Sequence, residues 1–371
     1  MALLHIEGFD KISDTTGAGS NTEAELYLER RYISSGFGTV KPDVWNGWQG
    51  GGCISFGDNG NADSNYIKIE VPEVATIITG FAFCMGVYKG NNAGAISVVE
   101  VAQVEHLGDG VEHLTIYVVN QRHILIRRGT TVDLAWAYNV LRPGQFGYIE
   151  LKATIHGSTG VLVMQVNGQE VMNETGLDTK NSGGTFDGAD AIRLSGIDGT
   201  TSTDFDGRIN SLFDDWYVSD TTGAAPNNDF LGPIKIEELM PDGAGNASDF
   251  TPLSGTNFSN VDEVPTDDDT TYVSSATTTD KDTHTLEALT DIDGTIFGVQ
   301  VYTVCRVEDV TTHGCTNVVR RSTSESSGAN PTVSSTSYVA VSDMFEQDPA
   351  AGPGVWTVTN VNAMEAGYEV G

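Results

Sequence analysis

The sequence predicts an all-β protein in which an antiparallel β-sandwich is followed by a second, smaller β domain. Short stretches with a two-residue apolar alternation recur along the chain, separated by turn residues, and only one stretch has the pattern of a helix. The chain has 371 residues, which is more than one ordinary core accommodates. We therefore expect two domains.

The clearest stretch runs from residue 148 to 171. Apolar residues at 149, 151, 153 and 155 alternate with others, which predicts a strand with one packed face and one face in water. A glycine-bearing loop at 156–160 leads into a second strand that ends at Val166. Asn167 and Gly168 predict a type I′ turn, because both residue types reach positive φ at low cost. An antiparallel meander follows, whose third strand starts at Val171.

The other elements of the first domain are shorter. A surface helix is expected over 23–31, with Thr22 as its cap and two arginines in its last turn. The first strand is expected within 3–10. Further strands are expected at 67–71, 77–87, 95–104, 115–119, 123–127 and 131–138.

The meander, together with the stretch FDDWYV at 213–218, resembles the concanavalin-A-like lectin (laminin-G-type) jelly roll. The resemblance covers residues 1 to 222 and implies a sandwich that serves lectins, glycan hydrolases and adhesive modules alike. The sequence at 221–232 resembles the junction in tailed-bacteriophage structural proteins at which such a sandwich meets a second β domain. The later stretches VDEVP, TYVSS, DKD and WTVTNVNAMEAG extend that resemblance, which implies a virion component.

These patterns predict three segments: a jelly-roll domain at 1–223, a linker at 224–233 and a Thr/Ser/Asp-rich β domain at 234–371. The last domain has few bulky apolar residues, so we expect it to dock to another virion protein or to copies of itself. Its strands are expected at 272–275, 284–286, 296–308 and 315–321, with a closing strand near the C-terminal end.

The charge balance restricts the partners. Lysine and arginine total 19 against 51 acidic residues, a formal charge of -32, which disfavours nucleic acid and anionic lipid. The most apolar region, 74–87, is too short to span a bilayer. The first residues lack the features of a secretory signal. We expect assembly in a host cytoplasm and location in the virion.

Two tryptophans in a glycine-rich stretch are the candidate glycan site. Trp45 and Trp48, with Asn46 between them, have the composition of an exposed platform for a sugar ring. The alternative is that one or both cover the end of the sandwich as core residues.

Acidic loop residues are the candidate metal site, and no other cofactor is expected. Carboxylates on neighbouring loops suit calcium, and related sandwiches often carry this ion. The alternative is that they are ordinary turn residues. The candidate ligands are Asp187, Asp190, Asp204 and Asp206. Of the pair Asp214 and Asp215, at most one is expected in the interior, because successive strand residues point to opposite faces.

Four cysteines do not make a disulfide framework. Cys53 and Cys84 are expected as buried thiols. Cys305 and Cys315 flank a predicted hairpin centred near residue 310, so a disulfide within the chain or between subunits is conceivable. The alternative is two reduced thiols.

No pattern of a catalytic site stands out. The sequence has no run of alternating carboxylates like that of the related glucanases, no metal-binding histidine pair, no nucleophile elbow and no phosphate-binding loop. We therefore expect a protein that is not an enzyme, a tail or neck fibre component of a bacteriophage whose lectin-like domain adheres to host glycans. The alternatives are a capsid decoration or head-fibre protein and, in another class, a glycan depolymerase.

Overall fold

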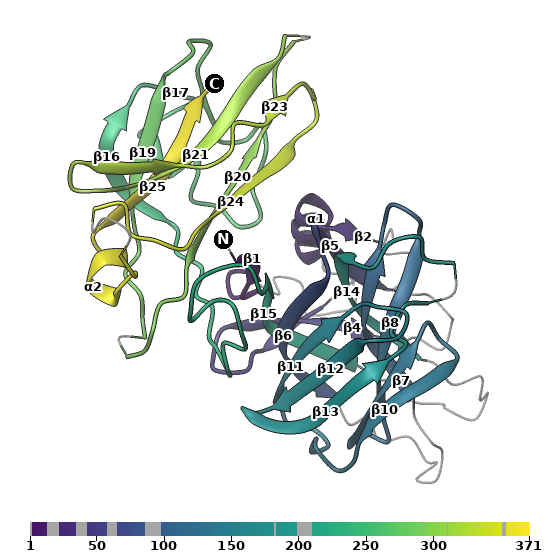
Figure 1. Ribbon diagram of the computed structural model, residues 1–371. Helices are drawn as coiled ribbons and strands as arrows, with labels where there is room; N and C mark the ends of the chain where they lie inside the picture. The colour runs from purple at the N-terminus through teal and green to yellow at the C-terminus, as the bar shows by residue number, and fades with distance from the viewer. Residues whose placement is uncertain are drawn as a thin grey trace. The chain divides into compact units, whose positions relative to one another are not determined.

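The structure is a computed structural model that describes residues 2–12, 22–34, 43–57, 65–85, 98–181, 183–198, 210–291, 293–309, 311–350 and 354–371. The chain divides into two compact units, unit 1 at Met1–Ile236 and unit 2 at Glu237–Gly371 (Figure 1). Every strand pairing in the described residues is antiparallel, and the all-β class is confirmed. None of the helices in these residues has the length and apolar character needed to cross a membrane.

Unit 1 is a sandwich of two sheets. Sheet A has the order β13-β12-β11-β6-β15-β4-β3, with β1 also paired to β15. Its strands are β1 (Leu3–Glu7), β3 (Asp43–Asn46), β4 (Gly52–Gly57), β6 (Thr76–Met85), β11 (Gly147–Thr154), β12 (Gly160–Val166), β13 (Gln169–Leu177) and β15 (Asn210–Asp220).

Sheet B has the order β10-β9-β8-β7-β14-β5-β2. Its strands are β2 (Ile33–Ser34), β5 (Tyr66–Val74), β7 (Val98–His106), β8 (Val111–Val119), β9 (His123–Arg128), β10 (Val132–Ala137) and β14 (Ala189–Asp198). The core lies between the sheets, where the rings of Phe56, Phe81 and Phe83 surround Phe213 at centroid distances of 5.3 to 5.8 Å. Buried aromatic groups of this size account for much of the apolar area that holds a sandwich together.

The predicted meander is confirmed as β11, β12 and β13. Asn167 and Gly168 both have positive φ, 52° and 72°, as a type I′ turn requires. The expectation that the other face of the first strand meets water is wrong for Tyr148 and Glu150, whereas Lys152 and Thr154 are half-buried. Glu150 on that face is fully buried, because its Oε1 accepts hydrogen bonds from the Tyr217 hydroxyl at 2.7 Å and from the amide of Gly232 at 2.9 Å.

The stretch 224–233, predicted as a linker, therefore lies in unit 1 and covers part of sheet A. Lys152 on β11 also forms an ion pair with Asp229 at 2.7 Å. The helix α1 (Thr22–Arg31) is present as predicted, with Ala24, Tyr27 and Leu28 buried.

The expectation for the acidic pair on β15 is also wrong. Asp214 and Asp215 are both buried, because a bulge interrupts the pairing of β15 with β6 between Asp214 and Tyr217 and Asp215 has a φ of 47°. Each carboxylate accepts a backbone amide: Asp214 from Trp48 at 2.6 Å and Asp215 from Ile236 at 2.6 Å. These two carboxylates anchor the segments that contain Trp48 and Ile236 to β15.

Unit 2 has one larger sheet and two strand pairs in its described residues. The larger sheet consists of β16 (Pro241–Ser248), β19 (Lys281–Leu286), β25 (Met364–Val370), β21 (His313–Arg321) and β22 (Ser324–Ser327), with β23 (Thr332–Val333) paired to β21. The pairs are β17 (Thr251–Pro252) with β18 (Val273–Ser274) and β20 (Val299–Cys305) with β24 (Val339–Phe345). Two short helices, η1 (Phe258–Asn260) and α2 (Val358–Val361), complete it.

The core of unit 2 gathers around Trp356, with Val301, Val319, Phe345, Val361, Met364 and Ala366. The predicted hairpin between the strands that carry Cys305 and Cys315 is wrong. β20 pairs with β24, and β21 pairs with β25, so the two strands are not partners in a ladder.

Candidate functional site

A polar face on sheet B is the candidate functional site. On β8 the residues Leu114, Ile116 and Val118 face the core, whereas Thr115 and Tyr117 face the opposite side. Residues paired across neighbouring strands share a face. The register therefore assigns to this outer face one row of Lys68, Arg193, Gln103, Thr115, Arg127 and Asp133.

Arg193 on β14 is the centre of the face. Its Nη2 lies 3.3 Å from Oε1 of Glu100, and its Nη1 donates to Oε1 of Gln103 at 3.0 Å. Nη1 also lies 3.9 Å from Oε1 of Glu112. The guanidinium carbon lies 4.2 Å from the centroid of the Tyr66 ring, so the cation stacks on an aromatic face. One guanidinium thus contacts two carboxylates, an amide and a ring.

Glu100 is a buried carboxyl group of this cluster, with 6% of the residue exposed. Burial raises its pKa above the ordinary value; Arg193 and a hydrogen bond from Ser195 Oγ at 2.9 Å oppose the shift, and the charges of Glu112 and Glu105 add to it. A carboxyl group with a raised pKa is suited to donate a proton near neutral pH.

Glu112 differs from Glu100 in its exposure, because 39% of its side chain is exposed. Since both carboxylates contact one guanidinium, they are no farther apart than the ~9.5 Å upper limit for the carboxylate pair of glycoside hydrolysis. A third carboxylate, Glu105, forms an ion pair with Lys68 on β5. The face therefore brings together a buried carboxyl group with a raised pKa, a more exposed carboxyl group and the cation that contacts both.

Towards β10 the face becomes more open and more apolar. Tyr117, Val119 and Leu125 form an apolar cluster with Val98. Arg127 lies 5.1 Å from the ring centroid of Tyr117 and donates to Asp133 at 2.7 Å. Exposure of the side chains rises from 11% at Arg193 to 30% at Arg127 and 46% at Asp133. The β9 and β10 side is therefore the more exposed end of the face, whereas Gln103 and Thr115 in its middle are buried.

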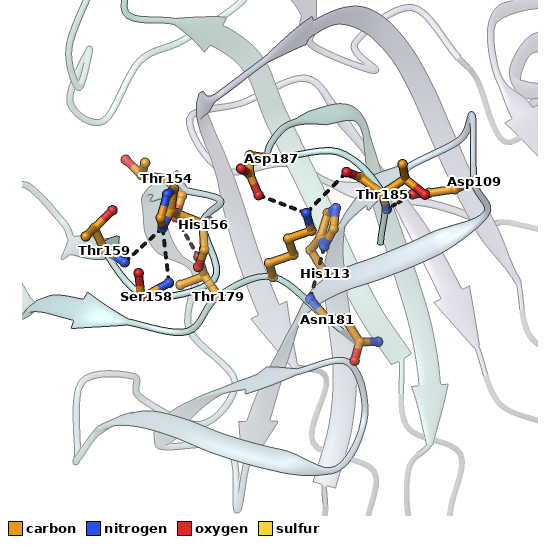
Figure 2. Close-up of polar contacts among 11 residues, drawn as sticks. Asp109, His113, Thr154, His156, Ser158, Thr159, Thr179, Asn181, Thr185 and Asp187 are labelled. Atoms are coloured by element: carbon orange, nitrogen blue, oxygen red, sulfur yellow. Dashed lines mark hydrogen bonds and ion pairs between the residues drawn. The ribbon is translucent and has the colours of Figure 1, made fainter. Parts of the chain in front are cut away.

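A loop borders the face beside the start of β8, as Figure 2 shows at His113 and Asp109. The amide of Asn181 donates to Nδ1 of His113 at 3.2 Å, and the amide of Thr185 donates to Asp109 at 2.7 Å. Lys180 forms an ion pair with Asp187 at 2.9 Å. Thr179 anchors the start of the loop, because its Oγ1 accepts from the amide of His156 at 2.9 Å. These contacts fix the border of the face.

The predicted glycan platform lies elsewhere, on the β3 to β4 turn. Asn46 is exposed, and Trp48 is half-buried with its ring edge towards Phe146 at a centroid distance of 6.2 Å. Trp45 lies on β3 opposite Cys53, and its side chain lies outside the described residues. The structure does not bring these residues to sheet B's polar face, and their glycan role stays a prediction.

Two of the four predicted calcium ligands are described: Asp187 lies in the bordering loop and Asp190 on β14. Asp187 pairs with Lys180, and Asp190 accepts the amide of Leu107 at 2.6 Å, so both carboxylates already have partners in the protein. Asp204 and Asp206 lie outside the described residues. Within the described ranges, no group of three or more His, Cys, Asp or Glu residues is arranged to hold a metal ion. Calcium stays a prediction.

The two pairs of cysteines are free thiols in the structure. Cys53 and Cys84 are buried, as predicted. Cys305 and Cys315 are hydrogen-bonded to each other, which lowers the pKa of Cys305 and raises that of Cys315. They share an apolar cluster with Val307, Val333 and Val341, so packing between strand pairs, not a hairpin, brings them together. Their oxidation stays a prediction.

The sequence contains a signal for the polar face that the sequence analysis missed. The stretches VVEVAQVEH at 98–106 and VEHLTIYVV at 111–119 carry polar residues inside otherwise apolar strands. Buried polar groups without a structural reason are typical of functional sites. The register between strands far apart in the sequence is needed to see that these residues converge with Arg193.

No protein-family model matches the chain. No curated protein matches it significantly. Three of the solved structures similar to it are each 10% identical in sequence. A sialidase has a TM-score of 0.35, and the match covers 59% of this chain and 19% of the sialidase chain. For alginate lyase Aly36B the TM-score is 0.37 and the match covers 58% of this chain and 96% of that chain, and for winged bean acidic lectin complexed with methyl-alpha-D-galactose the values are 0.36, 58% and 98%. This chain thus spans about a fifth of the sialidase's length.

These structures agree with the jelly-roll sandwich of the concanavalin-A-like type that the sequence predicts. They correct the prediction that the chain is not an enzyme, because two of the three are named as enzymes, a sialidase and an alginate lyase. At about 10% identity the likeness concerns the fold alone. The activity therefore has to be argued from the residues of the polar face.

Proposed function

We propose that unit 1 binds a glycan along the polar face of sheet B and hydrolyses a glycosidic bond there. The observation that carries this proposal is the guanidinium of Arg193 held between Glu100 and Glu112, one carboxyl group buried and the other exposed. Most glycoside hydrolases use two carboxylic acid side chains that differ in environment.

The different environments of Glu100 and Glu112 suggest which one acts as the acid and which as the base. Glu100, whose pKa is raised by burial, donates its proton to the glycosidic oxygen as the bond from that oxygen to the anomeric carbon breaks. Glu112, which is open to solvent, takes a proton from a water molecule that attacks the anomeric carbon. Attack by this water gives inversion at the anomeric carbon. Arg193 is the positioning residue that orients both.

Release of reducing ends from a panel of polysaccharides tests the proposal. Glu100→Gln removes the proton donor and keeps the shape, so we expect a loss of turnover of about 100-fold or more with glycan binding retained. The matched control is Glu174→Gln on β13, an exposed glutamate of sheet A that we expect to leave turnover unchanged.

Equal turnover by the Glu100→Gln variant and the native chain would show that Glu100 is not the acid. The configuration of the first product, read by nuclear magnetic resonance, checks the assignment of Glu112: retention would show that a carboxylate attacks the sugar directly.

We also propose that the chain is a component of a bacteriophage particle, in a tail or neck appendage or as a capsid decoration. The support is the resemblance of residues 221–232 and of stretches in unit 2 to phage structural proteins. Display of many copies makes weak glycan sites effective. Labelling of purified particles with an antibody against unit 2 tests this role, and particles without label would argue against it.

A further inference from the structure

Two exposed aromatic rings form a stacked pair at the edge of sheet B. Trp136 on β10 is 37% exposed and Tyr138, just after the strand, is 66% exposed. Their ring planes differ by 7° and their centroids are 5.6 Å apart. His123 on β9 contacts Tyr138 edge-on at 5.5 Å. Large aromatic rings exposed in this manner usually mark a binding surface.

The backbone holds this aromatic pair in place. The amide of Asn139 donates to Nδ1 of His123 at 3.0 Å. The amides of Val140 and Leu141 donate to the carbonyl of Arg122 at 2.9 and 3.1 Å. A φ of 57° at Asn139 turns the chain directly after Tyr138. The rings are therefore ordered before any ligand binds, which lowers the entropic cost of binding.

The aromatic pair continues the polar face. The register pairs Trp136 with Leu125, Leu125 with Tyr117 and Tyr117 with Glu100, so all four lie in one row on one face. Three strand spacings separate the first from the last, or ~14 Å. Between them lies the apolar cluster that contains Tyr117 and Leu125. Tyr117 and Leu125 are 6% and 1% exposed, so they support the face from within, and Trp136 and Tyr138 are the rings of this row on which a sugar can stack.

The charges of the face restrict the kind of sugar. Four carboxylates, Glu100, Glu105, Glu112 and Asp133, accompany three cations, Lys68, Arg127 and Arg193, and each cation is paired with a carboxylate. No unpaired cation of this row is left to recognise a uronate or a sulfate. The charge of -32 on the whole chain repels polyanions as well.

We infer that Trp136 and Tyr138 form an outer subsite that stacks on a pyranose ring, and that the ligand is a neutral, linear oligosaccharide long enough to reach from this pair to Glu100. This inference rests on the proposed function and specifies its substrate class. Stacking on the outer subsite adds binding energy only for ligands that span the row, so it selects for chain length.

Binding calorimetry in the Glu100→Gln background, where the probe is not consumed, tests the inference. The probes are cellohexaose, mannohexaose and xylohexaose, their disaccharides, and an alginate hexasaccharide. We expect Trp136→Ala to weaken binding of the neutral hexasaccharide about tenfold or more and to leave the disaccharide unchanged. Trp136→Phe keeps a ring and should restore most of the affinity. Leu253→Ala, which removes an exposed apolar residue of unit 2, is the control.

The outcomes separate this inference from the proposed function. Unchanged hexasaccharide binding in both Trp136→Ala and Tyr138→Ala would overturn the subsite, while the reducing-end assay of Glu100→Gln would still decide the hydrolysis. Binding of the alginate probe alone would overturn the neutral class. Absence of binding to every probe, with the protein folded, would overturn the inference together with the glycan site.

Discussion

At the scale of single residues, unit 1 buries ionisable groups in two different settings. Glu7 on β1 is enclosed by donors, because it accepts from the hydroxyls of Tyr27 at 2.7 Å and Tyr32 at 2.8 Å and from Arg31 at 2.8 Å. The charge of Arg31 and the hydrogen bonds from the two tyrosines keep the pKa of Glu7 low in spite of its burial. This carboxylate fastens α1 to the sandwich. Glu100, with fewer donors, remains able to exchange a proton.

The buried side chain of His5 should make the fold less stable at acid pH. Burial lowers the pKa of His5 from 6.5 to about 4, and its Nε2 lies 3.0 Å from the Tyr32 hydroxyl. As the pH falls below 6.5, His5 becomes protonated in the unfolded chain, whereas in the folded chain it stays neutral until about pH 4. The contribution of neutral His5 to the free energy of unfolding is therefore complete above pH 6.5. It is lost as the pH falls towards 4, and the total loss is about 3 kcal/mol.

The measurement is the free energy of unfolding at pH 7 and at pH 4.5. We expect His5→Gln, which can still bond to Tyr32 but does not titrate, to reduce the loss between these two values. His313→Gln in unit 2 is the control and should follow the native chain. An identical loss in the His5→Gln variant would mean that other groups cause the acid sensitivity.

At the scale of elements, local signals were sufficient for part of the fold only. The meander β11 to β13 followed from alternation and one Asn-Gly turn, because its strands are neighbours in sequence and in space. The pairings of β11 with β6 and of β20 with β24 join segments that are far apart in the chain, and alternation does not specify such partners. For the same reason the polar face was missed, since Glu100 and Arg193 meet only through β7 and β14.

The turn after β12 requires glycine at position 168. Gly168 has a φ of 72°, and a Cβ there would meet only Pro233 Cδ at 3.7 Å, an ordinary contact. The cost of Gly168→Ala is therefore conformational, about 1 kcal/mol in the free energy of unfolding. Gly157 in the preceding hairpin has open space around its Cα and is not in the left-handed region. We expect Gly157→Ala to leave the denaturation midpoint unchanged or slightly raised. Equal effects of both substitutions would contradict a special role for the turn.

At the scale of the whole molecule, the chain combines a high negative charge with two separate cores. The charge of -32 makes the few cations informative, because three of the 19 basic residues lie in one row of one sheet. Each unit has its own buried tryptophan with a satisfied indole: Trp216 donates to Thr79 at 3.0 Å, and Trp356 donates to the carbonyl of Phe345 at 2.8 Å.

These two tryptophans provide a matched test of whether the units unfold independently. Loss of a buried tryptophan side chain costs about 3 to 5 kcal/mol, and the cost falls on the cooperative unit that contains it. We expect calorimetry of the full chain to show two transitions, with Trp216→Ala lowering one and Trp356→Ala lowering the other. Glycan binding should then raise only the transition that Trp216→Ala lowers, because the ligand stabilises the unit that holds its site. A single transition that both substitutions shift equally would show that the two cores form one cooperative unit, and the glycan site would then depend on the folding of the whole chain.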